Sequence, residues 1–189
     1  MVDVAMLDCQ VAILENAIAR YVATGHVPGP LGARHPSIAP FAAYATARGH
    51  IVIAAASDEH WRMVADAIER PTLADDARFR TLTDRVTNAD ALSVEIEGAL
   101  AARPAEQWLE LLESRGLPCG PINNVAQALA DPQVQARNMV VGTTDPRMPG
   151  LKVAGNPIKL SGVPDPATRG PVPVLDGDRA SLMKELGIA

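Results

Sequence analysis

Residues 49–61 read GHIVIAAASDEHW, and they give the clearest indication of the fold class. The run HIVIAAA (50–56) is short, apolar and β-branched in part, which is typical of a buried strand. Ser57 or Asp58 can cap the helix that follows, and Trp61 begins its apolar face. A strand that leads directly into an amphipathic helix predicts a mixed α/β protein.

Downstream of this stretch, apolar residues recur at spacings of three and four and predict two further helices. One begins at Thr83 or Asp84 and runs to Leu100, and another runs from Pro104 to Gly116. Residues 50–116 are therefore predicted to form a compact lobe of one strand or hairpin and three helices. Trp61 and Trp108 are expected in its core, and Asp58 and Glu59 are read as a cap and a first-turn acid rather than an acid–base pair. Three arginines could contact an anion but are interpreted as part of a solvated connector: Arg78, Arg80 and Arg85.

Upstream of the strand lie a helix and a loop. Residues 3–24 have apolar side chains on nearly every face, as a buried helix has, and Gly25 suits its C-terminal cap. Residues 26–40 hold four prolines and two glycines, so they cannot form regular structure. The sequence alone supplies no segment that would cover the helix.

The C-terminal part is predicted to contain shorter elements and more extended chain than the central part. Asn124 is expected to cap a short helix over 125–130, and Asp131-Pro132 opens another. Two short strands joined by DPRMPG, an extended proline-rich stretch and a final helix from about 178 to 186 follow. Residues 142–177 are expected to bury little by themselves and to pack on another surface.

Composition excludes several classes of function. The net charge of −5 and the 3% aromatic content argue against nucleic-acid binding. No apolar run is long enough to span a membrane, and the N-terminus lacks the basic start of a signal peptide. Cys9 and Cys119 are predicted to be free, buried or half-buried thiols, so a cytoplasmic location is expected. The four histidines are not spaced to form a helical zinc pair, and no metal is predicted.

The loop GARHPSIAPF (32–41) carries the best candidate for substrate contact. An imidazole beside a guanidinium, as in His35 and Arg34, can bind phosphate or carboxylate. A loop histidine bonded only to backbone is the simpler interpretation, and both stay open on the residues alone. Asn123 and Asn124 are similarly read as capping residues rather than ligand contacts.

The order of motifs resembles the class III coenzyme A transferases, a family that includes the α-methylacyl-CoA racemases. The resembling stretches run along essentially the whole chain: VDVAMLD (2–8), HPSIAPFAAY (35–44), GHIVIAAASDEHW (49–61), DDARFRTLTDRVTNADAL (75–92), GLPCGPINNVAQALADPQVQARNMV (116–140) and GNPIKLSGVP (155–164). The stretch at 116–140 is the most specific. Because family members are about twice as long, the chain resembles their C-terminal half only.

The resemblance implies an α/β fold in which a small lobe is joined by a C-terminal segment that packs on a Rossmann-like large lobe absent from this sequence. Residues 1–25 would be a long helix of the large lobe, 26–49 the interlobe crossing, and 50–116 the small lobe. Residues 117–189 would return to the large lobe. Two chains would interlock as a homodimer.

The resemblance also implies a cleft-side role for Gly32, Arg34 and His35. Pro30 and Ala33 stand where the family commonly has arginine and asparagine, so two loop contacts are missing. The family's catalytic aspartate, which attacks the acyl thioester, lies upstream of VDVAMLD, and Asp3 and Asp8 do not match it. No residue of this chain is therefore predicted to be catalytic.

The resulting hypothesis is a C-terminal portion or subunit of an acyl-CoA transferase. It would act on an acyl-CoA and a carboxylic acid, with the coenzyme A thioester as substrate and no covalently bound cofactor, and would be inactive alone. Two alternatives stay open: a non-catalytic dimerisation or assembly remnant, and half of an acyl-CoA racemase.

Overall fold

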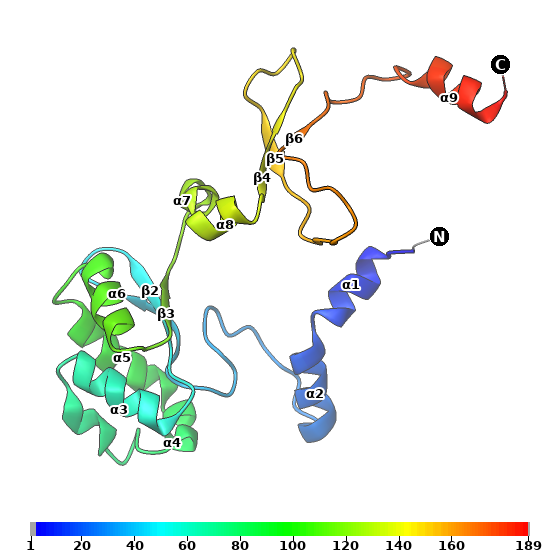
Figure 1. The fold of residues 1–189 in the computed structure, drawn as a ribbon. Coiled ribbons are helices and arrows are strands. Elements are labelled where there is room, and N and C mark those ends of the chain that lie inside the picture. Colours follow the sequence, from blue (N-terminus) through cyan, green and yellow to red (C-terminus); the bar gives the residue numbers. More distant parts are fainter. Residues whose placement is uncertain (1–2, 189) are drawn as a thin grey trace. The chain divides into compact units, whose positions relative to one another are not determined.

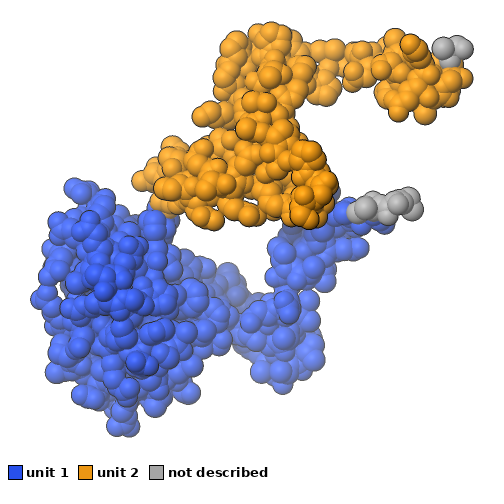
Figure 2. All heavy atoms as spheres, viewed as in Figure 1, with its two compact units in different colours: residues 1–122 blue, residues 123–189 orange. Residues whose placement is uncertain are grey.

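The computed structural model describes residues 3–188 and divides into two compact units (Figure 2). The N-terminal unit comprises Met1–Ile122 and the C-terminal unit Asn123–Ala189. Within the described residues, no helix is both long and apolar enough to cross a membrane.

The N-terminal unit begins with two helices rather than the single one predicted over 3–24. These are α1 (Met6–Ala12) and α2 (Glu15–Thr24), separated by a turn in which the Leu14 amide donates to Val11. Gly25 ends α2 in the left-handed conformation, at φ 69°, as predicted. None of the helical residues is buried, and the apolar side chains of Met6, Leu7 and Val22 are 73% exposed or more. The apolar surface expected of a buried helix is thus uncovered within this structure.

A three-stranded antiparallel sheet organises the rest of the unit (Figure 1). Its strands are β1 (Phe41–Ala45), β2 (His50–Ala54) and β3 (Cys119–Pro121), in that order. The sequence suggested β2 but missed β1, because FAAYA consists of three alanines and two aromatics and shows no alternation of polar and apolar side chains. The sheet therefore draws in residues on both sides of 50–116, and we call residues 41–121 the sheet lobe.

Helices pack against this sheet around one apolar core. The core contains both tryptophans, Trp61 and Trp108, which are 1% and 2% exposed, as predicted. The helix expected up to Leu100 is in fact two helices, because the chain leaves helical geometry at Asn88. The helical elements of the lobe are α3 (Asp58–Ala67), the 3-10 turn η1 (Pro71–Ala74), α4 (Leu82–Thr87), α5 (Ala89–Leu100) and α6 (Ala105–Ser114).

Arg85 was interpreted as part of a solvated connector, and the structure shows that this interpretation is wrong. Its side chain is fully buried, and its Nε donates to the Ala39 carbonyl at 2.7 Å. Its other nitrogens donate to the carbonyls of Phe79 and Arg80 and to the Asp58 carboxylate, the last at 2.7 Å. A buried guanidinium is tolerated only when its donors are paired, and here they tie the loop before β1 to α3 and α4.

The C-terminal unit starts with two short helices whose caps were predicted. Asn124 and Gln127 form a reciprocal capping box at α7 (Val125–Ala130). The Asp131 carboxylate accepts from the amides of Gln133 and Val134 at the start of α8 (Pro132–Ala136). Strands β4 (Val140–Thr143) and β5 (Lys152–Ala154) pair antiparallel, as expected.

The stretch predicted to be extended adds one element to this small sheet. Strand β6 (Thr168–Arg169) pairs parallel with β4, and the final helix α9 (Arg179–Leu186) follows. Most residues after Gly155 are exposed, including Leu160 and Leu175 at 59% and 100%. The unit buries little apolar surface by itself, which agrees with the expectation for residues 142–177.

Candidate functional site

The loop before β1 folds back along that strand. Arg34 bridges Ala42, the His35 amide donates to the Phe41 carbonyl at 2.8 Å, and the Ala43 amide donates to the Ala33 carbonyl at 3.3 Å. These bonds pin residues 33–35 to the edge of the sheet. The loop is therefore anchored at the point where its two candidate polar side chains emerge.

Gly32 precedes this anchored segment and has φ +63°, a conformation that side-chain-bearing residues rarely adopt. A Cβ built on Gly32 would meet no heavy atom within 4 Å. The requirement for glycine here is thus one of backbone geometry and not of space.

His35 is held by two contacts. Its ring stacks on Phe41 with centroids 5.1 Å apart and an interplanar angle of 11°. Its Nδ1 accepts from the Ser37 amide at 3.2 Å, which assigns the proton of the neutral ring to Nε2. Both interpretations of His35 are therefore compatible with the geometry: Nδ1 serves the backbone, and Nε2 is left as a donor.

Arg34 points toward α5, where its guanidinium pairs with Asp90 at 2.8 Å. The two side chains are 38% and 91% exposed. An ion pair this open to water contributes at most about 1 kcal/mol. A carboxylate or phosphate could therefore replace Asp90 at little energetic cost.

Of the three residues predicted to lie beside the cleft, the structure places only one in the lining of a cavity beside α2. His35 lines a hollow of about 420 Å³ with residues of α2 and the loop, whereas neither Gly32 nor Arg34 is among its lining. Arg20 of α2 lines the same hollow and was missed in the sequence. The available signal was a lone cation in a helix that is otherwise apolar on nearly every face.

Other candidates take structural roles. Asp58 holds the buried Arg85, Glu59 lies in the first turn of α3, and Ser57 caps that helix through the His60 amide at 3.0 Å. Asn124 is a helix cap. Within residues 3–188, no group of three or more histidine, cysteine or acidic side chains could hold a metal ion.

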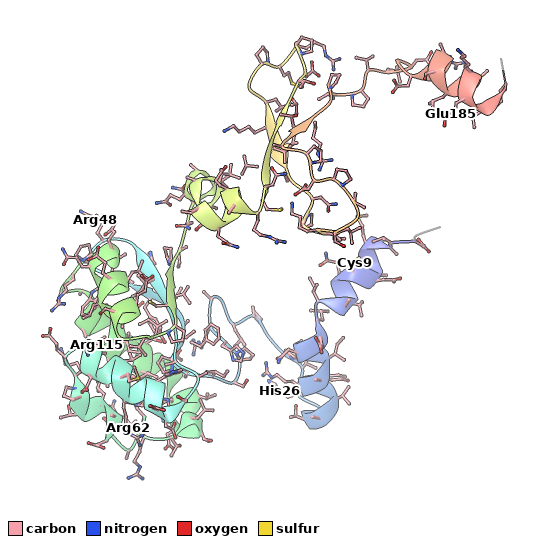
Figure 3. The ribbon with its side chains drawn as sticks, viewed as in Figure 1. Cys9, His26, Arg48, Arg62, Arg115 and Glu185 are labelled. Atoms are coloured by element: carbon pink, nitrogen blue, oxygen red, sulfur yellow. The ribbon has the colours of Figure 1, made fainter. Side chains whose placement is uncertain are left out.

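The two cysteines differ from each other. Cys9 is exposed on α1 (Figure 3), contrary to the expectation of a buried thiol. Cys119 is half-buried in β3, and burial, reinforced by Glu113, raises the pKa of its thiol. Neither the burial of Cys119 nor the nearby Glu113 carboxylate favours a reactive thiolate at this position.

Comparison with known sequences gives the family. The sequence profile of CoA-transferase family III matches residues 1–179. The acetyl-CoA:oxalate CoA-transferase of Acetobacter aceti is 40% identical over 184 residues, which is 97% of this chain and 46% of that protein. A succinyl-CoA:mesaconate CoA-transferase of Haloarcula hispanica is 37% identical over 99% of this chain and 46% of its own length.

Solved structures agree with this result. A CAIB/BAIF family protein from Brucella suis superposes with a TM-score of 0.77 and 32% identity, over 96% of this chain and 47% of the other. A mutant of Rv3272 from Mycobacterium tuberculosis gives 0.75 and 26%, over 95% and 45%. The chain spans about half the length of the relatives it matches. The resemblance seen in the sequence is confirmed: the chain belongs to CoA-transferase family III.

Proposed function

We propose that this chain is one portion of an acyl-CoA transferase that moves coenzyme A between carboxylic acids. In such a reaction the thioester bond of one acyl-CoA is broken, that acyl group leaves as a free carboxylate, and a second carboxylic acid forms the new thioester. The observation that carries the proposal is the 40% identity to a CoA-transferase along nearly all of this chain. Because this chain spans 46% of that protein, we infer that it needs the remainder and is inactive alone.

A short dicarboxylic acid is the acceptor we propose. The related transferases are named for oxalate, mesaconate and glutarate. A dicarboxylate keeps one anionic group when the other becomes a thioester, and a guanidinium is suited to bind it. Arg34, whose guanidinium pairs with the exposed Asp90, is the residue we propose for that contact, beside His35 on a loop whose turn requires Gly32.

The uncovered apolar surfaces support a need for further structure. Val4, Leu7 and Val22 are more than 70% exposed, and a surface of this kind marks an interaction site. We propose that residues 1–25 and 117–189 pack on a Rossmann-like large lobe supplied by the rest of a family-length chain. An interlocked homodimer and a cytoplasmic location belong to the same proposal.

Reconstitution tests the proposal. The purified chain is mixed with the N-terminal portion of the Acetobacter aceti relative, and transfer of coenzyme A from acetyl-CoA to oxalate is followed by mass spectrometry. We expect a complex to form and transfer to appear only in the mixture. Failure of the two parts to associate, or transfer by the chain alone, would refute the proposal.

A matched pair of variants makes the test specific. Val22→Asp places a charge on the exposed face of α2, where the side chain is 76% exposed, and should abolish association. Val94→Asp makes the same change on α5 at 71% exposure, outside the proposed contact, and should leave association unchanged. Equal behaviour of the two variants would show that α2 is not the contact surface.

A further inference from the structure

The C-terminal unit contains a cavity of about 350 Å³ within its own residues. Its wall is formed by the end of α8, the loop 156–165 and Arg169 of β6. This volume lies in the range of small-molecule sites, at about 300–1,000 Å³.

Positive charge dominates the lining. Arg137, Lys159 and Arg169 contribute cations, and Asp165 contributes the one carboxylate. Lys159 is paired with Asp165 at 2.6 Å, whereas no ion pair between described residues involves Arg137 or Arg169. The charge of Arg169 also acts on the Asp165 carboxylate, and the cations of the lining exceed its carboxylates by two.

The position of the acidic residue is fixed by the backbone. The Asn138 side chain donates to the carbonyls of Asp165 and Pro166 at 3.1 and 3.3 Å. Asn138 has a positive φ of 51°, a conformation that asparagine tolerates better than most residues. The loop therefore has a defined closure onto the end of α8.

The remaining lining is apolar. Ile158, Leu160 and Val163 are 57–67% exposed and face a cavity that also carries the cations. A combination of apolar walls with a few polar groups is typical of sites for organic ligands. Inorganic phosphate would satisfy the cations but leave the apolar walls in contact with water.

We infer that this cavity is a binding site for a small organic dianion, a short dicarboxylate whose two charges meet Arg137 and Arg169 and whose methylenes meet the apolar wall. Lys159 strengthens the site when it turns from Asp165 toward the ligand. The site lies in a different unit from the Gly32–His35 loop and does not rest on the proposed transfer activity. Its test measures binding alone.

Calorimetric titration of the whole chain at low ionic strength tests the site with three probes. Glutarate has two charges and an apolar body, phosphate lacks the apolar body, and butyrate lacks the second charge. We expect saturable binding of glutarate, about tenfold or more tighter than that of butyrate, since one charge-assisted bond is lost. Absence of glutarate binding, or phosphate binding as tight, would overturn the inference.

Variants locate the binding in the cavity. Arg169→Gln should weaken glutarate binding about tenfold or more, whereas Arg115→Gln, at an exposed residue of the N-terminal unit (Figure 3), should not change it. Asp165→Asn removes the competing carboxylate and should tighten binding, a gain that misfolding cannot produce. Weaker or unchanged binding in Asp165→Asn would contradict the assignment.

Discussion

The guanidinium of Arg85 occupies a place in the core that an apolar side chain usually fills. It is 0% exposed, lies 5.9 Å from the Trp61 ring centroid, and donates to backbone carbonyls of the loop before β1 and of the segment before α4. The anchoring of the Ala39 carbonyl links the core directly to the loop that carries Arg34 and His35.

Replacement of Arg85 by methionine should therefore destabilise the sheet lobe. The buried carbonyls of Ala39 and Phe79 would lose their donor, which costs about 1–3 kcal/mol for each unsatisfied group. Urea unfolding followed by tryptophan fluorescence measures this loss. The matched control, Arg80→Met, changes an exposed arginine and should stay within about 0.5 kcal/mol. Similar stability of the two variants would contradict the role assigned to Arg85.

Gly155 is a second position at which the structure depends on one residue, because no Cβ fits there. A Cβ at this position would overlap the Asn138 carbonyl oxygen, so that alanine forces the backbone apart beside β5. Gly155→Ala should destabilise the C-terminal unit by about 1–3 kcal/mol, as overpacking does. Gly162→Ala, where nothing lies within 4 Å, is the control and should have little effect on thermal unfolding. Equal melting temperatures would refute the proposed close approach.

The turn between β4 and β5 is joined to the segment after β6 by one carboxylate. Asp145 is 2% exposed and accepts from Arg147 and from the Val172 amide at 2.9 Å. Arg147 in turn donates to the Val172 carbonyl. This carboxylate is thus the principal polar link between the hairpin and the segment that follows β6.

Asp145→Asn should release that segment. The amide of Val172 should exchange its hydrogen faster, because the carboxylate acceptor is weakened. Asp178→Asn, at an exposed position without a side-chain cap, should leave the exchange unchanged. Mass spectrometry of deuterated peptides covering 168–174 reads the difference, and an unaltered exchange rate in Asp145→Asn would contradict the link.

The same carboxylate predicts a pH dependence. Hydrogen bonds from Arg147 hold the pKa of Asp145 well below its usual range. Because the folded pKa is the lower one, the stabilisation is complete above the unfolded value, about 3.9, and is lost as the pH falls further. The difference in melting temperature between the native chain and Asp145→Asn should therefore persist near neutral pH and shrink below about pH 4. A difference that does not depend on pH would contradict this.

The elements also show what the sequence could predict. The caps at Asn124 and Asp131 depend on bonds within three residues and were predicted correctly. Strand β1 depends on pairing with β2, and the burial of Arg85 depends on carbonyls up to 46 residues away. The sequence pattern contains no local signal for such contacts. The loop at Gly32–His35 could be proposed, but the hollow shared by Arg20 and His35 required the structure.

The two parts of the N-terminal unit should differ in local stability. Residues 3–25 have no buried side chain, whereas the sheet lobe has a continuous core. Amides of α1 and α2 should therefore exchange much faster than those of α3 and α5 in the isolated chain. Association with the complementary portion should slow their exchange. Equal protection of both regions in a monomer would show that these helices need no further cover.

The claim that the chain is one portion of a CoA-transferase is tested most directly by its activity alone. The purified 189-residue chain is incubated with acetyl-CoA and oxalate, and oxalyl-CoA is measured by mass spectrometry against a no-enzyme control. We predict no transfer above the control at any concentration of the chain. Transfer that rises in proportion to the amount of this chain would contradict the account, because the chain would then contain a complete catalytic centre.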